Sequence, residues 1–132
     1  MPTILFLCPH NAAKSVIAAT YFRALAAREG IPFEASTAGT DPDAEIWPSV
    51  IAMLREAGLE VEPATPRTVQ PEDFQRAHRV VSLGCDVANV AGNTPVEHWD
   101  GVPMPSKDLG ASRDAIARRV QALVTELKSN PG

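Results

Sequence analysis

The stretch TILFLCPHNAAKSVIAATYF, residues 3–22, decides how this chain is expected to fold. Residues 3–7 are short, apolar and suited to β-structure, as expected of a strand buried in a parallel sheet. From Lys14 to Glu29, apolar residues recur at helical spacing, and Gly30 follows as a typical helix C-cap. Cys8 stands at the end of the strand, and a short loop leads from it into the helix.

Strands and helices continue to alternate along the rest of the chain. Further strands are expected at residues 33–38 and 79–83, with a weaker short helix and strand within 86–99. Further helices are expected at 46–57, in a short segment that begins at Pro71, and at 113–128 with Ser112 as N-cap. This order predicts a single α/β domain over residues 1–132. Its expected architecture is three α/β/α layers around a central, mostly parallel four-stranded sheet.

Composition limits the classes of function. The chain has 132 residues, of which 45% are apolar and 21% charged, an ordinary balance for one compact domain. Its net charge of −4 does not suggest nucleic acid or an anionic membrane as a partner. The spacing of Cys8 and Cys85 fits neither a zinc site nor a secreted disulfide framework, which predicts a cytoplasmic protein. No signal peptide or membrane span is expected.

The carboxyl end of the first strand is the candidate site, because open α/β sheets bind ligands there. Backbone N–H groups of the loop after Cys8 can converge on an anion, and such donors beside a helix N-terminus favour a thiolate. A thiolate next to a cradle for a tetrahedral oxyanion suits nucleophilic attack on phosphorus or arsenic. The alternative is that Cys8 is a small buried hydrophobic residue.

Several residues of the loop have two interpretations each. The Ser15 hydroxyl can reach the thiolate or cap the helix, and Lys14 can balance an anion or point to solvent. His10 can shape the loop by a hydrogen bond or act in catalysis. The predicted oxyanion cradle consists of Pro9, His10, Asn11, Ala12, Ala13, Lys14 and Ser15.

The loop CPHNAAKS, residues 8–15, resembles the Cys-x5-Arg-Ser loop of the low-molecular-weight protein tyrosine phosphatase superfamily. More narrowly, it is similar to the Cys-x-His-Asn-Ala-Gly-Arg-Ser loop of the thioredoxin-coupled arsenate reductase branch. The stretches at 35–40, 66–86 and 96–101 resemble further parts of that family. The resemblance implies a phosphotyrosine protein phosphatase I-like fold without a cofactor or metal. It also implies either phosphomonoester hydrolysis through a phosphocysteine or arsenate reduction by the same loop.

The chain departs from this pattern within the loop itself. Lys14 stands where the family has arginine, so the positive charge is kept but the planar fork of donors is lost. Loss of one positioned donor of this kind costs roughly a hundredfold or more in rate. Ala13 replaces a glycine, which requires a negative φ at that position unless strain is accepted.

The family's general acid is also replaced. Met104 stands where the resemblance places the aspartate of an Asp-Pro pair, with Pro105 retained, and a methionine cannot protonate a leaving group. Asp100 or Asp108 could take its place if the loop folds differently, or both could be solvated carboxylates. The predicted catalytic set is Cys8, Lys14, Ser15 and Asp100.

The redox residues of the reductases are present only in part. Cys85 occupies or adjoins the position of their second cysteine, but residues 87–95 contain no third. A relay through three thiols is therefore impossible, whereas a scheme with two thiols or an external thiol reductant stays open. Cys85 can equally be a core thiol. Ala19 replaces a glutamate associated with ion binding in some reductases, so no potassium site is predicted.

Three functions remain open at this level: phosphatase, arsenate reductase, or a catalytically weakened oxyanion-binding regulatory module of the same fold. The expected partners are phosphate, arsenate or a phosphorylated substrate, with a possible thiol reductant, and the chain is expected to be a monomer or weak dimer. Trp47 could form an aromatic wall near the loop or simply pack the second helix.

Overall fold

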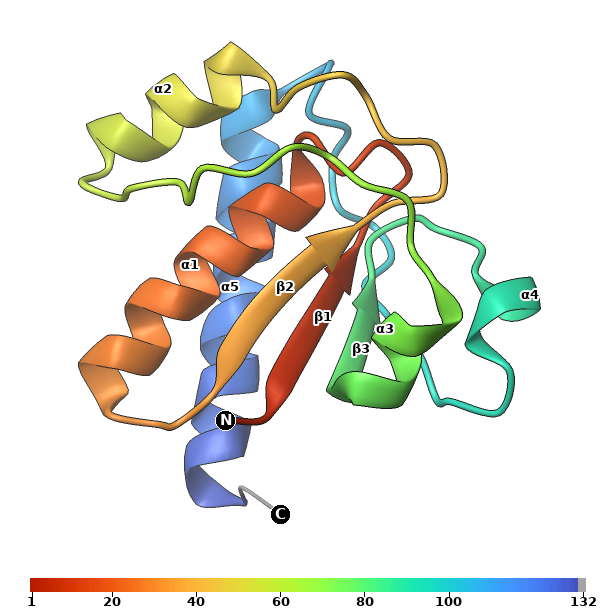
Figure 1. Ribbon diagram of the computed structural model, residues 1–132. Helices are drawn as coiled ribbons and strands as arrows, with labels where there is room; N and C mark the ends of the chain where they lie inside the picture. The colour runs from red at the N-terminus through yellow and green to blue at the C-terminus, as the bar shows by residue number, and fades with distance from the viewer. Residues whose placement is uncertain (131–132) are drawn as a thin grey trace.

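The computed structural model describes residues 1–130 and shows a central sheet with helices on both faces (Figure 1). Its four strands are β1 (Thr3–Leu7), β2 (Glu34–Ala38), β3 (Ala77–Ser82) and β4 (Glu97–His98). Their spatial order is β2-β1-β3-β4, and each neighbouring pair is parallel. The helices are α1 (Lys14–Glu29), α2 (Pro48–Glu56), α3 (Pro71–Arg76), α4 (Ala88–Ala91) and α5 (Leu109–Ser129). The predicted α/β fold around a parallel four-stranded sheet is confirmed.

β1 lies in the middle of the sheet, between β2 and β3. Residues 4–7 are buried, as the apolar sequence of this strand predicts. Leu7 stands opposite Ala38 of β2 and Ser82 of β3, so these three strands end at the same level. The residues that follow the three ends therefore gather at one edge of the sheet.

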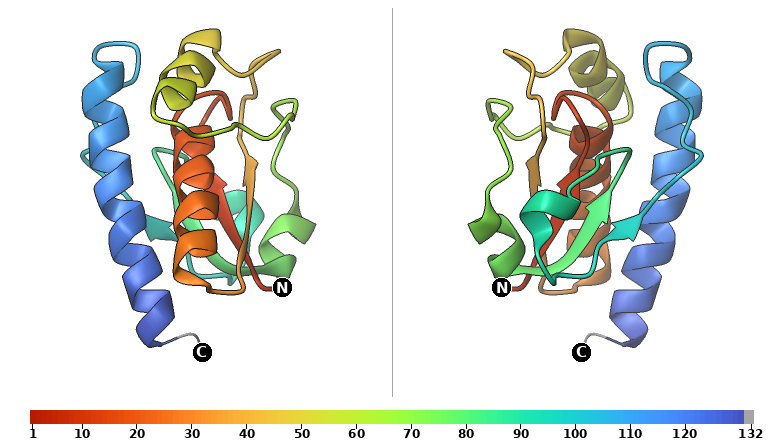
Figure 2. Two further views of the ribbon diagram at one scale, coloured as in Figure 1. Left: turned by 90° about the vertical axis from the view of Figure 1, so that its left-hand side faces the viewer. Right: turned by 90° about the vertical axis from the view of Figure 1, so that its right-hand side faces the viewer.

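Helices α1 and α5 cover one face of the sheet, and α3 and α4 cover the other (Figure 2). Phe6 faces the first pair of helices, and its ring packs against Phe22 of α1 at 5.8 Å between centroids and against Trp99 at 5.9 Å. Leu5 points to the opposite side and packs in a second cluster with Phe74 of α3. β1 is thus buried on both faces.

α5 begins at Leu109, four residues before the start predicted from the sequence. The Asp108 carboxylate caps it by accepting the backbone N–H of Ala111 at 2.9 Å. The predicted cap at Ser112 is wrong, because this serine lies inside the helix and is fully buried. An aspartate earlier in the chain forms the cap instead.

α5 runs for 21 residues and buries one stripe of its surface against the sheet. The buried apolar residues of this stripe are Ile116, Val120, Leu123, Val124 and Leu127. The other side is polar and exposed. Within residues 1–130, no helix is both long enough and apolar enough to cross a membrane.

β4 is a two-residue edge strand that pairs only with the end of β3. Arg79 of β3 fastens this edge to α5, because its guanidinium donates to Glu97 at 2.7 Å and to Glu126 at 2.6 Å. The two carboxylates raise the pKa of Arg79 against the opposing effect of partial burial. The guanidinium thus joins β3, β4 and α5.

Candidate active site

Cys8 is the first residue after β1, and its side chain is buried. Ser15, in the first turn of α1, contacts the sulfur twice. The backbone N–H of Ser15 donates to Cys8 Sγ at 3.3 Å, and the thiol donates to Ser15 Oγ at 3.0 Å. In an ionised Cys8 the sulfur only accepts, so the hydroxyl can then donate to it. The N-terminus of α1 therefore supports a nucleophilic thiolate.

Asn11 fixes the path of the loop between Cys8 and α1. Its backbone has φ +50°, in the left-handed region that asparagine adopts more readily than most residues. The side chain is buried, donates from Nδ2 to Ser15 Oγ at 3.0 Å and accepts the backbone N–H of Arg67 at 3.0 Å. The loop rejoins α1 through Ala13, whose φ of −137° is compatible with alanine in place of glycine.

Gly39, which follows β2, allows the loop to pack directly on the neighbouring strand. A Cβ at this position would lie 2.6 Å from the carbonyl oxygens of both Cys8 and Pro9, and 3.0 Å from the backbone nitrogen of Asn11. All three contacts are with backbone, which cannot move aside as a flexible side chain can. The position of the cradle therefore depends on the absence of a side chain at Gly39.

Gly39→Ala is expected to lower the activity of the Cys8 site by about a hundredfold, because displacing a reacting group by about 1 Å can cost that factor. The added methyl group should also lower the free energy of unfolding by about 1–3 kcal/mol, as overpacking does. Activity assays and urea unfolding measure the two effects.

Gly110→Ala is the matched control, because a Cβ there meets nothing closer than 3.7 Å inside α5. This control should keep full activity and full stability. If Gly39→Ala behaved in the same way, the cradle would not depend on this close packing.

Lys14 begins α1, and its ammonium lies beside Gly84, just beyond β3. A Cβ built on Gly84 would lie 3.1 Å from Lys14 Nζ. Lys14 and Cys8 line the same pocket, so the charge is available to an anion bound at the sulfur. The positive charge is that of a compact ammonium, which lacks the paired, planar donors of a guanidinium.

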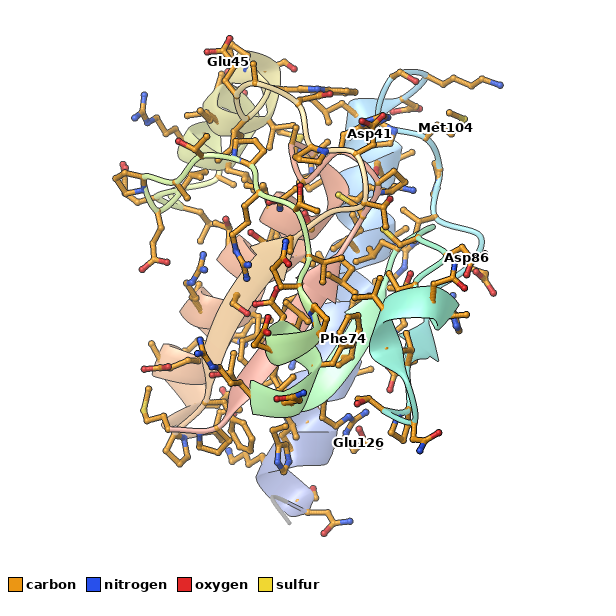
Figure 3. The ribbon with its side chains drawn as sticks, turned by 45° about the vertical axis from the view of Figure 1, so that its right-hand side comes forward. Asp41, Glu45, Phe74, Asp86, Met104 and Glu126 are labelled. Carbon is orange, nitrogen blue, oxygen red and sulfur yellow. The ribbon has the colours of Figure 1, made fainter. Side chains whose placement is uncertain are left out.

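The pocket above Cys8 has a volume of about 270 Å³. It is lined by residues from the loop and α1, from the start of α2, and from the segment before α5: Cys8, Pro9, His10, Ala13, Lys14, Trp47, Met104, Pro105 and Ser106. Figure 3 shows Met104 and Asp41 toward one end of the molecule and Glu126 toward the other. The pocket thus opens at the carboxyl end of the sheet.

The predicted cradle residues divide into two groups. Pro9, His10, Ala13 and Lys14 line the pocket, whereas Asn11, Ala12 and Ser15 are buried behind it. Pro9 has no N–H and contributes only to the wall. Trp47 lines the pocket and also packs against the core, so both of the roles considered from the sequence apply to it.

The structure does not bring the expected carboxylates to the pocket. Within residues 1–130, the pocket lining includes no Asp or Glu, and Met104 occupies the rim with 55% of its surface exposed. Asp100 lies elsewhere, where its carbonyl oxygen accepts a hydrogen bond from Arg119 at 2.7 Å. Asp108 caps α5. The early start of α5 therefore engages one candidate acid, and the other lies outside the lining.

Cys85 lies close to this site but is buried outside the pocket lining. Burial raises the pKa of the Cys85 thiol and the nearby Cys8 adds to the rise, whereas Thr40 and Lys14 act in the opposite direction. The Thr40 hydroxyl is 3.9 Å from Cys85 Sγ. Both cysteines are free thiols.

Asp43, which the sequence analysis did not single out, orients two of the pocket walls. One carboxylate oxygen lies 3.5 Å from His10 Nδ1, and the other accepts the indole N–H of Trp47 at 3.0 Å. The spacing of Asp43 and Trp47 by four residues was the available signal. The contact between Asp43 and His10 joins two loops that are distant in the sequence, so no local sequence pattern predicts it.

A buried cysteine that follows the first strand of a parallel sheet, and that the first turn of the next helix holds at the base of a pocket, defines a cysteine-nucleophile α/β domain. The family model described as low molecular weight phosphotyrosine protein phosphatase matches residues 3–130. The chain therefore belongs to that family.

Individual relatives agree with this assignment. The arsenate reductase of Bacillus licheniformis is 28% identical over 130 residues, which cover 94% of this chain and 90% of the relative. A crystal structure of the arsenate reductase from Archaeoglobus fulgidus is 32% identical, with a TM-score of 0.74 and coverage of 93% of this chain and 99% of that one. YfkJ from Bacillus subtilis is 21% identical and has the same fold, with a TM-score of 0.90 over 100% of this chain and 98% of that one.

Proposed function

We propose that this protein hydrolyses phosphomonoesters through a phosphocysteine formed on Cys8. The observation that carries the proposal is the buried sulfur of Cys8, held by the N–H and hydroxyl of Ser15 at the base of a pocket that Lys14 also lines. Membership of the phosphotyrosine phosphatase family supports the same reaction.

The chemistry proceeds in two displacements at phosphorus. The thiolate attacks, an S–P bond forms, and the bond from phosphorus to the ester oxygen breaks. Water then attacks the phosphocysteine, releasing phosphate and the thiolate. Lys14 and the loop amides balance the charge of the transferring phosphoryl group, and Ser15 stabilises the departing thiolate by donating its hydroxyl proton in a hydrogen bond.

The pocket walls support an aryl phosphate such as phosphotyrosine as the substrate class. Trp47 and Met104 present an apolar surface beside Cys8, and an aromatic ring packs well against an indole and a thioether. A phenol is also a less basic leaving group than an aliphatic alcohol, which suits a pocket without an aspartate at position 104.

Arsenate reduction is a second candidate, and the position of Cys85 beside Cys8 favours it. In that reaction the Cys8 thiolate displaces water from arsenate and forms an S–As(V) adduct. A second thiol, from Cys85 or an external reductant, then attacks the Cys8 sulfur and the S–As bond breaks. The two thiols are oxidised to a disulfide, and arsenic leaves reduced to As(III). The named arsenate reductases among the relatives support this candidate.

One experiment separates these proposals. The purified protein is expected to hydrolyse p-nitrophenyl phosphate, to be inhibited competitively by vanadate, and to carry phosphate on Cys8 after rapid acid quenching. Arsenate-dependent oxidation of NADPH through thioredoxin or glutathione, without p-nitrophenyl phosphate turnover, would replace the first proposal by the second. Phosphate binding without either activity would instead identify an oxyanion-binding module, which the enzymatic relatives do not favour.

The two cysteine thiols also bear on the cellular compartment. Two free thiols, one of them the nucleophile, require a reducing compartment, and the cytoplasm is the one that we propose. A monomer or weak dimer stays our expectation.

A further inference from the structure

The leaving group of a phosphomonoester needs a proton, and within residues 1–130 the pocket lining offers no carboxyl group to supply it. The ionisable residues of the lining are Cys8, Lys14 and His10. Cys8 is the nucleophile and Lys14 faces the anion. Histidine is the side chain that exchanges protons near neutral pH, so His10 is the candidate that remains.

The contacts of His10 determine which ring nitrogen is free. Its Nδ1 lies 3.0 Å from the backbone carbonyl oxygen of Asp41. A carbonyl oxygen only accepts, so Nδ1 carries a hydrogen and donates it. Nε2 makes no hydrogen bond to the residues that the structure describes, and the side chain is 52% exposed beside the pocket. Nε2 can therefore hold a transferable proton.

Carboxylates support the opposite side of the ring. Asp43 Oδ1 is 3.5 Å and Asp41 Oδ2 is 4.0 Å from His10 Nδ1. The backbones of the two loops are joined as well, because Asp41 N–H donates to Pro9 O at 2.7 Å and Asp43 N–H donates to His10 O at 3.0 Å. A carboxylate behind a histidine fixes its orientation and stabilises the cation formed during proton transfer.

Resting on the proposed function, we infer that His10 takes over the acid-base role for which this chain has no aspartate at position 104. In the first step, His10 Nε2–H gives its proton to the ester oxygen as the P–O bond breaks, leaving the ring neutral. In the second step, the neutral Nε2 takes a proton from the water that attacks the phosphocysteine. The ring ends protonated, so each turnover is balanced.

Asp43 is the positioning residue in this arrangement. It contacts His10 with one oxygen and the Trp47 indole with the other, so it holds the proton donor and the apolar wall in one geometry. The charged groups facing His10 are Asp41 and Asp43 from the segment between β2 and α2, and Cys8 and Lys14 across the pocket. The lining residues from the segment before α5, Met104 to Ser106, carry no charge.

The test compares His10→Gln with the unaltered protein on two substrates. Phenyl phosphate has a basic leaving group that needs a proton, whereas p-nitrophenyl phosphate has a weakly basic one. His10→Gln should lower kcat/KM for phenyl phosphate by about a hundredfold, the usual contribution of an acid-base group, and lower kcat/KM for p-nitrophenyl phosphate far less, because kcat/KM reports the steps through P–O cleavage and not the second step that both substrates share. Retained turnover of the second substrate also shows that the variant is folded.

The pH profile provides the second readout. In the unaltered protein, kcat/KM for phenyl phosphate should fall on the alkaline side as the proton donor of the first step is lost, and His10→Gln should lack that fall. Asp43→Asn should lower kcat/KM for phenyl phosphate more than for p-nitrophenyl phosphate, since it removes the carboxylate that positions the ring. His98→Gln, at an exposed histidine on β4, is the control and should leave kcat/KM for both substrates and the pH profile unchanged.

Equal losses of kcat/KM for the two substrates, or an unchanged alkaline fall in His10→Gln, would overturn the role of His10 as proton donor while leaving the phosphatase proposal intact. Absence of turnover and of a phosphocysteine in the unaltered protein would overturn both.

Discussion

Cys8→Ser is expected to remove p-nitrophenyl phosphate hydrolysis, lowering kcat by at least about a thousandfold, as the loss of a catalytic nucleophile does. The hydroxyl of serine stays protonated near neutral pH and is a far weaker nucleophile than a thiolate. The cradle itself should survive, because serine preserves the shape of the side chain next to Ser15. Steady-state assays measure the loss of turnover.

Phosphate binding by the same variant should be equal to that of the unaltered protein or tighter, since removing a thiolate removes a negative charge next to the bound anion. Isothermal titration with inorganic phosphate measures this. Cys85→Ser is the matched control and should keep its phosphatase activity, because Cys85 is buried outside the pocket lining. Hydrolysis that persisted in Cys8→Ser would assign the reaction to another nucleophile.

Lys14→Arg is expected to raise kcat/KM for p-nitrophenyl phosphate by about ten- to a hundredfold. A guanidinium presents two parallel donors to a tetrahedral anion, and an ammonium presents one point charge. A single positioned donor contributes about 3–4 kcal/mol to a transition state of this kind. Lys14 Nζ lies next to Gly84, where a Cβ would approach it to 3.1 Å, so a glycine at this position removes one obstacle to the longer group.

The same replacement distinguishes a weakened enzyme from a non-catalytic module. If kcat rises, the guanidinium stabilises the transition state. If KM falls and kcat is unchanged, the guanidinium binds the anion equally well in the ground state and the transition state. Lys107→Arg, at an exposed position before α5, serves as the control and should change neither constant. A rate that stayed level or fell in Lys14→Arg would show that this pocket is built around an ammonium.

The sequence allowed the core of the fold to be predicted because its signals there are local. The apolar run of β1, the helical spacing of α1 and the C-cap at Gly30 each act within a few residues. The cysteine after β1 could then be placed by the general rule that parallel strands end at the binding edge. The resemblance to the phosphatase family added its further support to the same loop.

The site residues that could not be predicted are those brought together by register. Asp43 meets His10 only because β1 and β2 end at the same level and Gly39 lets their loops touch. The role of Asp108 depended on where α5 begins, because a one-turn difference in that start made this residue the cap. Spacing along the chain does not encode such contacts.

The edges of the sheet have a consequence for how the protein behaves at high concentration. β4 exposes only two residues, and the charged network of Arg79, Glu97 and Glu126 covers it. At the other edge, Gly39 pairs with Thr68, and Arg23 donates to the carbonyl oxygen of Ala35 in β2. Within residues 1–130, neither border offers a long row of free amide groups, which disfavours strand-to-strand aggregation between molecules.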